Sequence, residues 1–233
     1  MRTDTKAIPM VQISDLLKTY YVDGQRFRAV DTVSLEVTKG EIVSIVGHSG
    51  SGKTTLLSLI GGLTRPDSGQ LLVDGAELWS MRDDALSAFR NRKMSFIYQF
   101  SSLIPTLTAI ENIMLPTAFG TEIKDIAGRA SELLSMVGLK EKMNAYPSHL
   151  SGGQQRRIAI ARAFINRPEL VLADEPTGDL DEETENEIIQ LFHRMNTELG
   201  VTFIIVTHNR EIAAQAGKQL SMSHGVLKRR TGT

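Results

Sequence analysis

The segment GHSGSGKT at residues 47–54 constrains the fold of this 233-residue chain more than any other feature. It fits the pattern G-x-x-x-x-G-K-[ST], directly follows the apolar run Ile42–Val46 and precedes the helix-like residues 54–60. A buried strand, a glycine-rich turn and a helix are the context in which this pattern binds phosphate groups. A chance glycine-rich turn would not have both flanks, so the sequence predicts a phosphate-binding loop in an α/β core.

Each residue type in this loop has a physical reason to be there. Glycines let the backbone curl so that successive N–H groups point at phosphate oxygens, and the next helix adds the dipole of its N-terminus. Lys53 supplies a point charge to the terminal phosphates of a nucleotide, and the Thr54 hydroxyl can bind Mg²⁺. The residues expected to contact the nucleotide are Gly47, His48, Ser49, Gly50, Ser51, Gly52, Lys53, Thr54 and Thr55.

Two acids end another apolar run. Residues 170–173 (LVLA) are followed by Asp174 and Glu175, and ligand sites lie at the carboxyl ends of buried parallel strands. We expect Asp174 to hold Mg²⁺ through a water molecule and Glu175 to polarise the water that attacks the terminal phosphate. The alternative is an ordinary acidic loop, which the nearby phosphate motif makes the weaker interpretation.

Strand-like and helical runs alternate along the chain. The runs Met94–Ile97, 170–173 and 201–206 are short and rich in apolar residues, which predicts an α/β fold with a mainly parallel sheet. Alternating apolar positions among the first forty residues, with a turn at Gly24, predict an antiparallel β part; they are Val11, Ile13, Val33, Leu35 and Val37. We expect one domain over residues 1–233, with 1–100 and 151–233 as its core and about 101–150 as a helical insertion.

Composition narrows the class of protein. Apolar residues make up 41% and charged residues 23%, a balance that excludes wholesale disorder. The formal net charge of −1 argues against a nucleic-acid partner, and the basic residues 228–230 are interpreted as a solvated tail. No apolar run exceeds four residues, the N-terminus lacks the apolar segment of a secretion signal, and cysteine is absent. We therefore expect an intracellular chain without a membrane span.

A second glycine-rich helix start lies at residues 150–154 (LSGGQ). Ser151, Gly152, Gly153 and Gln154 precede an apolar-periodic run, and the N-terminus of such a helix can bind a second anion. One phosphate group needs one cradle of this kind. Two of them therefore suggest a composite site.

The motifs and their order resemble the ATP-binding-cassette (ABC) ATPases over nearly the whole chain. The matching segments are a Walker A loop at 47–54, a Q-loop glutamine at Gln99, the LSGGQ signature at 150–154, Walker B at 170–174, a D-loop at 178–181 and a switch histidine at His208. This resemblance implies the P-loop NTPase fold of an ABC nucleotide-binding domain. It also implies an enzyme that hydrolyses ATP to ADP and phosphate with Mg²⁺ as cofactor.

The same resemblance implies roles for single residues. Tyr20 would stack on adenine, with Tyr21 as the competing choice and a plain strand aromatic as the other alternative. Gln99 would reach Mg²⁺ and the attacking water, and His208 would sense the γ-phosphate. The implied catalytic set is Lys53, Gln99, Glu175 and His208, and the implied metal ligands are Thr54, Gln99 and Asp174.

Partners also follow from the resemblance. Two copies of the chain would pair head to tail, so that each ATP lies between the Walker A loop of one copy and Ser151 and Gly153 of the other, with Asp181 crossing the interface. Residues 96–100, 107–116 and 173–181 look like the ATPases of lipoprotein release, macrolide export and haem export, which work with FtsX-like or MacB-like permeases. His48 and Asp179 depart from the commonest pattern of that group.

The implied permease would dock in a groove near Gln99. Phe100, Leu103, Leu107 and Ile113 are candidates to line it, and core packing is the alternative for each of them. The chain would then lie on the cytoplasmic face of the inner membrane, held there by the permease. An import ATPase and a cell-division regulator with an FtsX-like partner remain alternative functions, because both share these motifs.

Overall fold

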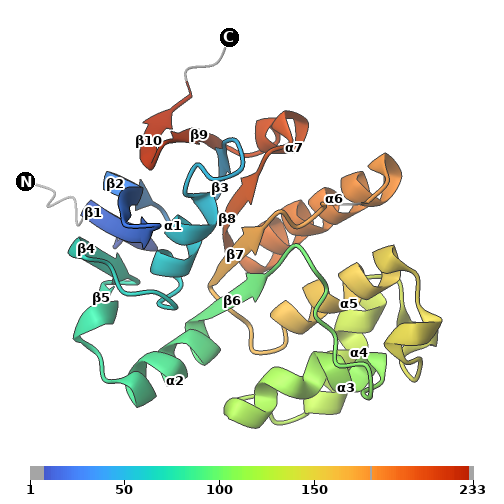
Figure 1. The fold of residues 1–233 in the computed structure, drawn as a ribbon. Helices are drawn as coiled ribbons and strands as arrows, with labels where there is room; N and C mark the ends of the chain where they lie inside the picture. The colour runs from blue at the N-terminus through green and yellow to red at the C-terminus, as the bar shows by residue number, and fades with distance from the viewer. Residues whose placement is uncertain (1–7, 179, 231–233) are drawn as a thin grey trace, which may run out of the picture.

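Two β-sheets form the framework of the structure, a computed structural model that describes residues 8–178 and 180–230. In this part of the chain the larger sheet has six strands and runs through the centre of the molecule (Figure 1). In spatial order they are β10 (Val226–Arg229), β9 (Lys218–Ser223), β3 (Ile42–Val46), β8 (Thr202–Thr207), β7 (Leu170–Asp174) and β6 (Met94–Ile97). Strands β9 to β6 pair in parallel, and β10 pairs antiparallel with β9. The predicted α/β fold with a mainly parallel sheet is confirmed.

The smaller sheet is antiparallel. Its strands, in the order in which they lie, are β2 (Gln25–Val37), β1 (Val11–Val22), β4 (Ser68–Val73) and β5 (Ala76–Glu77). A tight turn joins β1 to β2, and Gly24 adopts a φ of +76° there, a value that side-chain-bearing residues rarely take. Val11 pairs with Val37 and Ile13 with Leu35, so the predicted apolar alternation faces one side of this sheet.

Side chains of the central sheet alternate between two hydrophobic cores. In β8, Phe203 and Ile205 join the core that includes α3 to α6, whereas Ile204 and Val206 join the core that includes α1 and the antiparallel sheet. Successive strand residues point to opposite faces, so both faces of this sheet are buried. This double burial is why its strands appear in the sequence as continuous apolar runs.

The helices cover both faces of the central sheet (Figure 1). They are α1 (Lys53–Ile60), α2 (Asp83–Lys93), α3 (Ala109–Met114), α4 (Ile126–Met136), α5 (Gly152–Ala163), α6 (Glu182–Leu199) and α7 (Arg210–Ala214). Short 3₁₀ turns are η1 (Leu78–Ser80), η2 (Leu115–Phe119), η3 (Lys140–Lys142) and η4 (Pro147–His149). Helix α1 packs between the two sheets and thereby fixes the loop that precedes it.

Helices α3, α4 and α5 form a lobe beside the central sheet (Figure 1). Thr108 and Glu111 start α3 with a reciprocal capping box, and the fully buried Asn112 hydrogen-bonds the backbone of Ile104 and Leu107. Buried side chains of α3 and α4 belong to the same core as those of α5 and α6. Ile113, a candidate groove residue, is one of them and is fully buried.

Some elements differ from the sequence prediction. Strand β7 includes Asp174, and β8 covers Thr202–Thr207 where residues 201–206 were expected. Strand β10 was not predicted, because it lies at a sheet edge and its residues are largely exposed, so it lacks an apolar alternation. In the described residues, no helix combines the length and apolar character needed to cross a bilayer.

Candidate functional site

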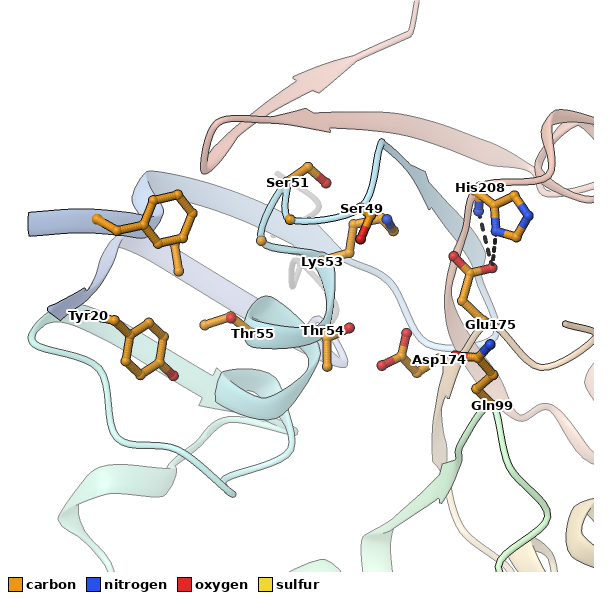
Figure 2. Close-up of a pocket in the computed structure, with 14 residues that line it drawn as sticks. Tyr20, Ser49, Ser51, Lys53, Thr54, Thr55, Gln99, Asp174, Glu175 and His208 are labelled. Atoms are coloured by element: carbon orange, nitrogen blue, oxygen red, sulfur yellow. Dashed lines mark hydrogen bonds and ion pairs between the residues drawn. The ribbon is translucent and has the colours of Figure 1, made fainter. Parts of the chain in front are cut away.

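A cavity of about 430 Å³ lies where the loop after β3 meets the carboxyl ends of β6, β7 and β8 and the β1–β2 hairpin (Figure 2). Most of the predicted site residues line it. The lining residues are Tyr20, Phe27, Ala29, Ser49, Gly50, Ser51, Gly52, Lys53, Thr54, Thr55, Gln99, Asp174, Glu175 and His208. Because the strands are parallel, their carboxyl ends bring together residues far apart in the sequence.

The loop backbone requires glycine at two positions, because each of them lies against the backbone of a neighbouring strand. A Cβ at Gly52 would lie 1.9 Å from the carbonyl oxygen of Ala29 on β2, and the φ of Gly52 is +104°. A Cβ at Gly47 would lie 2.3 Å from the carbonyl oxygen of Met222 on β9. The loop is therefore packed closely against two neighbouring strands as well as shaped for a ligand.

Lys53 is held over the loop in the described structure. Its Nζ donates hydrogen bonds to the carbonyl oxygens of Gly47 at 2.7 Å and His48 at 3.2 Å, and the residue is 8% exposed. Ser51 beside it has a buried Oγ with no hydrogen-bond partner among the described residues. A charged amine and an unsatisfied hydroxyl at a helix N-terminus form a cradle suited to an anion.

The donors beside this cradle suit Mg²⁺. Thr54 offers a hydroxyl, Asp174 a carboxylate and Gln99 an amide oxygen, and all three line the cavity. These are the hard oxygen ligands that Mg²⁺ prefers. The described residues contain no cluster of three or more His, Cys, Asp or Glu side chains able to hold a metal. The set therefore fits an ion whose remaining coordination positions are filled by water molecules and by the phosphate oxygens of a nucleotide.

Asp174 and Glu175 differ in environment although they are adjacent. Burial raises the pKa of the Asp174 carboxyl, and the charge of Glu175 adds to this, while a hydrogen bond from Thr54 and the charge of Lys53 act in the opposite direction. A bound cation would offset this burial and favour the ionised carboxylate. Asp174 is thus arranged to gain from a positive charge in the cavity.

Glu175 is held by a histidine. Its Oε2 accepts hydrogen bonds from the backbone N–H of His208 at 3.2 Å and lies 3.0 Å from His208 Nδ1 (Figure 2). Glu175 has a φ of +45°, and its own N–H donates to the carbonyl oxygen of Val206. A non-glycine residue in this conformation is strained, and such strain concentrates at functional sites. The side chain of Glu175 is 15% exposed, whereas that of His208 is 74% exposed.

Aromatic side chains line the other end of the cavity. Tyr20 is among the lining residues, whereas Tyr21, which is 75% exposed, is not. Lys18 Nζ lies 5.6 Å from the centre of the Tyr20 ring. Phe27 pairs with Tyr20 across the hairpin and also lines the cavity, a residue that sequence reasoning missed. Its position opposite Tyr20 on a predicted hairpin was the signal that could have found it.

The signature residues lie outside this cavity. Ser151 caps α5 by accepting a hydrogen bond from the N–H of Gln154, whose side chain accepts one from the N–H of Ser151. Ser151 and Gly152 are exposed, and a Cβ at Gly152 would meet no atom within 4 Å. Asp181, also exposed, caps α6 through Thr184, whose hydrogen bonds lower the pKa of the Asp181 carboxyl. The exposed N-terminus of α5 thus lies outside the cavity that the loop before α1 lines.

Comparison with known proteins decides the family. A family profile described as "ABC transporter" matches residues 30–178, more than half of the chain. The chain belongs to the ABC transporter family. The resemblance found in the sequence and the classification as an ABC ATPase are therefore confirmed.

Individual ABC proteins resemble the chain along most of its length. The lipoprotein-releasing system ATP-binding protein LolD of Bordetella avium is 44% identical over 97% of this chain and 98% of its own. The macrolide export ATP-binding/permease protein MacB of Syntrophobacter fumaroxidans is 42% identical over 96% of this chain but only 32% of its own. A dimeric structure of the ATP-binding cassette MJ0796 in a post-hydrolysis state, bound to ADP and Pi, has a TM-score of 0.86 at 38% identity and covers 96% of this chain and 100% of its own.

His48 is the one of the two departures from the subfamily pattern that lies within the described residues. Among the described contacts of His48, its carbonyl oxygen accepts hydrogen bonds from Lys53 and from the N–H of Ser51. These bonds use the backbone, so a change of side chain at this position leaves them intact. Asp179 lies outside the described residues.

Proposed function

We propose that this ABC ATPase binds ATP in the cavity beside Lys53 and hydrolyses it to drive a membrane permease of an export or force-transmitting system. One observation carries the proposal: the phosphate-binding loop, Asp174, Glu175, Gln99 and His208 share one cavity, while the chain's own signature residues lie outside it. The relatives named for lipoprotein release and macrolide export support the choice of system.

The nucleotide lies along the cavity. Tyr20 stacks on the adenine ring, with Phe27 at the same end, and the N–H groups of residues 47–55 bind the phosphates. Lys53 leaves the carbonyl oxygens of its loop and pairs with the β- and γ-phosphates, because an anion is the stronger partner for an ammonium group. Thr54, Gln99 and Asp174 would hold Mg²⁺, which would supply charge stabilisation to the phosphate oxygens.

Glu175 and His208 serve the chemical step. A water molecule beside Glu175 attacks the γ-phosphorus, the bond to the bridging oxygen of ADP breaks, and the Glu175 carboxylate accepts the proton that the water loses. The backbone N–H of His208 holds Oε2 of this carboxylate in the described structure. The exposed His208 ring can turn toward the γ-phosphate, which gives it the role of sensor.

Two copies of the chain complete each site. Ser151 and Gly153 of one copy bind the γ-phosphate held by the other, and Asp181 lies at the interface between them. The exposure of the α5 N-terminus and the dimeric state of the related cassette support this arrangement. The γ-phosphate then bridges the two copies, so hydrolysis releases them.

A permease of the FtsX or MacB type docks near Gln99 and holds the chain on the cytoplasmic face of the inner membrane. Phe100 is 71% exposed on the segment after β6, and the exposed Tyr98 stacks on Phe96 with ring centres 5.7 Å apart. Phe96 and Leu63 line a second cavity of about 210 Å³. Exposed apolar side chains beside a cavity are typical of a protein-binding site.

Two measurements test the proposal. The purified chain should release phosphate from ATP with Mg²⁺, and the release should fail in EDTA; absence of turnover at high protein concentration contradicts the enzymatic part. Phe100→Asp should lose binding to a co-expressed four-span permease, while Tyr21→Asp, a matched change at an exposed aromatic elsewhere, should keep it. Equal binding by both variants contradicts the proposed groove.

A further inference from the structure

The segment from Tyr98 to Ser102 has no regular secondary structure, yet its carbonyl groups are bound by one helix. Arg156 of α5 donates hydrogen bonds to the carbonyl oxygens of Tyr98 and Gln99. Arg162, further along the same helix, donates to those of Ser101 and Ser102 at 2.9 Å each. Two guanidinium groups of α5 therefore bind almost the whole segment that carries Gln99.

Arg156 also reaches a third part of the chain. Its Nη2 lies 3.4 Å from the carbonyl oxygen of Gly178, and Gly178 itself packs against Gln99, since a Cβ there would lie 3.4 Å from Gln99 Cγ. Arg156 is only 4% exposed. A buried guanidinium is costly unless its donors are satisfied, and the N–H donors of its planar fork point in fixed directions that can reach acceptors on separate segments.

The helix that holds these arginines begins at the signature. Ser151 caps α5, and Gln155 ties η4 to the start of the helix through Pro147 and Leu150. An α-helix is a stiff element, so a shift of its middle moves its N-terminus as well. Arg156 thus bonds both the Gln99 segment and Gly178, and it belongs to the helix that begins at the signature residues.

We propose that Arg156 is a positioning residue that makes the Gln99 segment, Gly178 and the signature helix move as one body, with Arg162 as a second attachment. The proposal rests on the proposed function for the identity of the site. It goes beyond that function because it assigns the coupling between the nucleotide cavity and the signature to one side chain that is not among the residues lining the cavity.

Kinetics separate this role from a purely structural one. Arg156→Gln should lower kcat by about tenfold or more while the KM for ATP changes by less than about threefold, because the phosphate-binding loop is untouched. Arg156→Lys should recover part of kcat, and Arg162→Gln should show a smaller loss than Arg156→Gln. Arg129→Gln is the matched control, since Arg129 is a largely buried arginine of α4 that pairs with Glu132.

The absence of cysteine allows a second measurement that does not depend on turnover. Spin labels at Phe100→Cys and Ser148→Cys, both exposed, report the distance between the Gln99 segment and the start of the signature helix. With Arg156 present we expect one narrow distance distribution with or without ATP, and with Arg156→Gln a broad one. If Arg156→Gln does not fold, the same distances are measured with Arg156→Lys.

The outcomes distinguish the two proposals. An inactive wild-type chain overturns the proposed function, and the spin-label distances still test the coupling. If the wild-type chain is active and Arg156→Gln keeps its kcat per folded molecule, with an unchanged distance distribution, the coupling role of Arg156 is overturned. A lower melting temperature with an unchanged kcat also overturns the coupling role, because Arg156 then contributes to stability alone.

Discussion

The two acids at the end of β7 lie in different environments although they are adjacent in the chain. Asp174 ends the strand and is partly buried beside Thr54, where a cation offsets the burial that raises its pKa. Glu175 turns into a left-handed conformation and points at His208 instead. The left-handed backbone at Glu175 therefore accompanies a change of surroundings between the two carboxylates, one beside Thr54 and the other beside His208.

Glu175→Gln tests this division. We expect the variant to bind ATP with near wild-type affinity, since the charge of Lys53 and the loop N–H groups are unchanged. Its turnover should fall by about 10² to 10⁴, the usual contribution of a general base. Phosphate release and size exclusion with ATP and Mg²⁺ measure both effects, and the stalled variant should elute as a dimer. A purely monomeric, fully active variant would contradict the role.

The choice between the neighbouring tyrosines gives a second prediction. Tyr20→Ala should weaken ATP binding by about 1–3 kcal/mol, the usual contribution of stacking on a base, because Tyr20 lines the cavity. Tyr21→Ala is the matched control and should leave the Kd unchanged, because Tyr21 is 75% exposed and is not among the lining residues. Calorimetric titration of both variants decides between them, and a reversed order would assign the adenine contact to Tyr21.

Elements differed in how well the sequence predicted them. The bounds of β3 and β6 were predicted correctly because each is a short apolar run followed by a distinctive motif. Strand β10 was missed because it is held by backbone pairing with β9 and exposes most of its side chains. Phe27 was missed although the predicted turn at Gly24 sets its pairing with Tyr20, because the register runs without a shift from Val22 and Gln25 to Thr19 and Arg28. Residues that lie in contiguous motifs were therefore predicted, whereas Phe27, which strand pairing brings to the cavity, was missed.

A network of charges joins the two sheets at the end opposite the cavity. Asp74, in the turn between β4 and β5, accepts hydrogen bonds from Lys39 and Lys93, and Lys93 also pairs with Glu169. Lys93 and Glu169 immediately precede β6 and β7. The bond from Lys39, with that from Lys93, lowers the pKa of Asp74 below 3.8, and the bond to Glu169 raises the pKa of Lys93 above 10.5.

The network predicts a pH-dependent stability. A lowered Asp74 pKa stabilises the folded state above pH 3.8, and this contribution disappears as the pH falls through the folded-state value. Asp74→Asn should therefore lower the free energy of unfolding by about 1 kcal/mol near neutral pH, since water screens a partly exposed network. Urea unfolding of both proteins should show this difference shrinking below pH 3.8. A difference that persists unchanged in acid would contradict the electrostatic origin.

At the scale of the whole molecule, the phosphate-binding loop and the signature residues do not share a cavity. The phosphate-binding loop opens into the cavity, whereas the capped start of α5 is exposed and apart from it. The proposed head-to-tail dimer would bring the loop of one copy to the signature of a second copy. Arg156 of the signature helix α5 bonds the backbone of Gln99, which lines the cavity, and this contact is the basis of the proposed coupling within each chain.

Mixing two inactive variants tests this arrangement most directly. Lys53→Ala removes the charge that would bind the phosphates, and Ser151→Arg blocks the signature with a bulky cation, so neither variant alone should form a working site. In a mixed dimer, the intact loop of one copy meets the intact signature of the other. With random pairing and independent sites, an equal mixture should recover about a quarter of wild-type turnover, because half of the dimers each contain one intact site. Phosphate release measured across mixing ratios should peak at equal amounts. If Ser151→Arg alone stays active, or if no mixture recovers activity, each site does not draw on two copies.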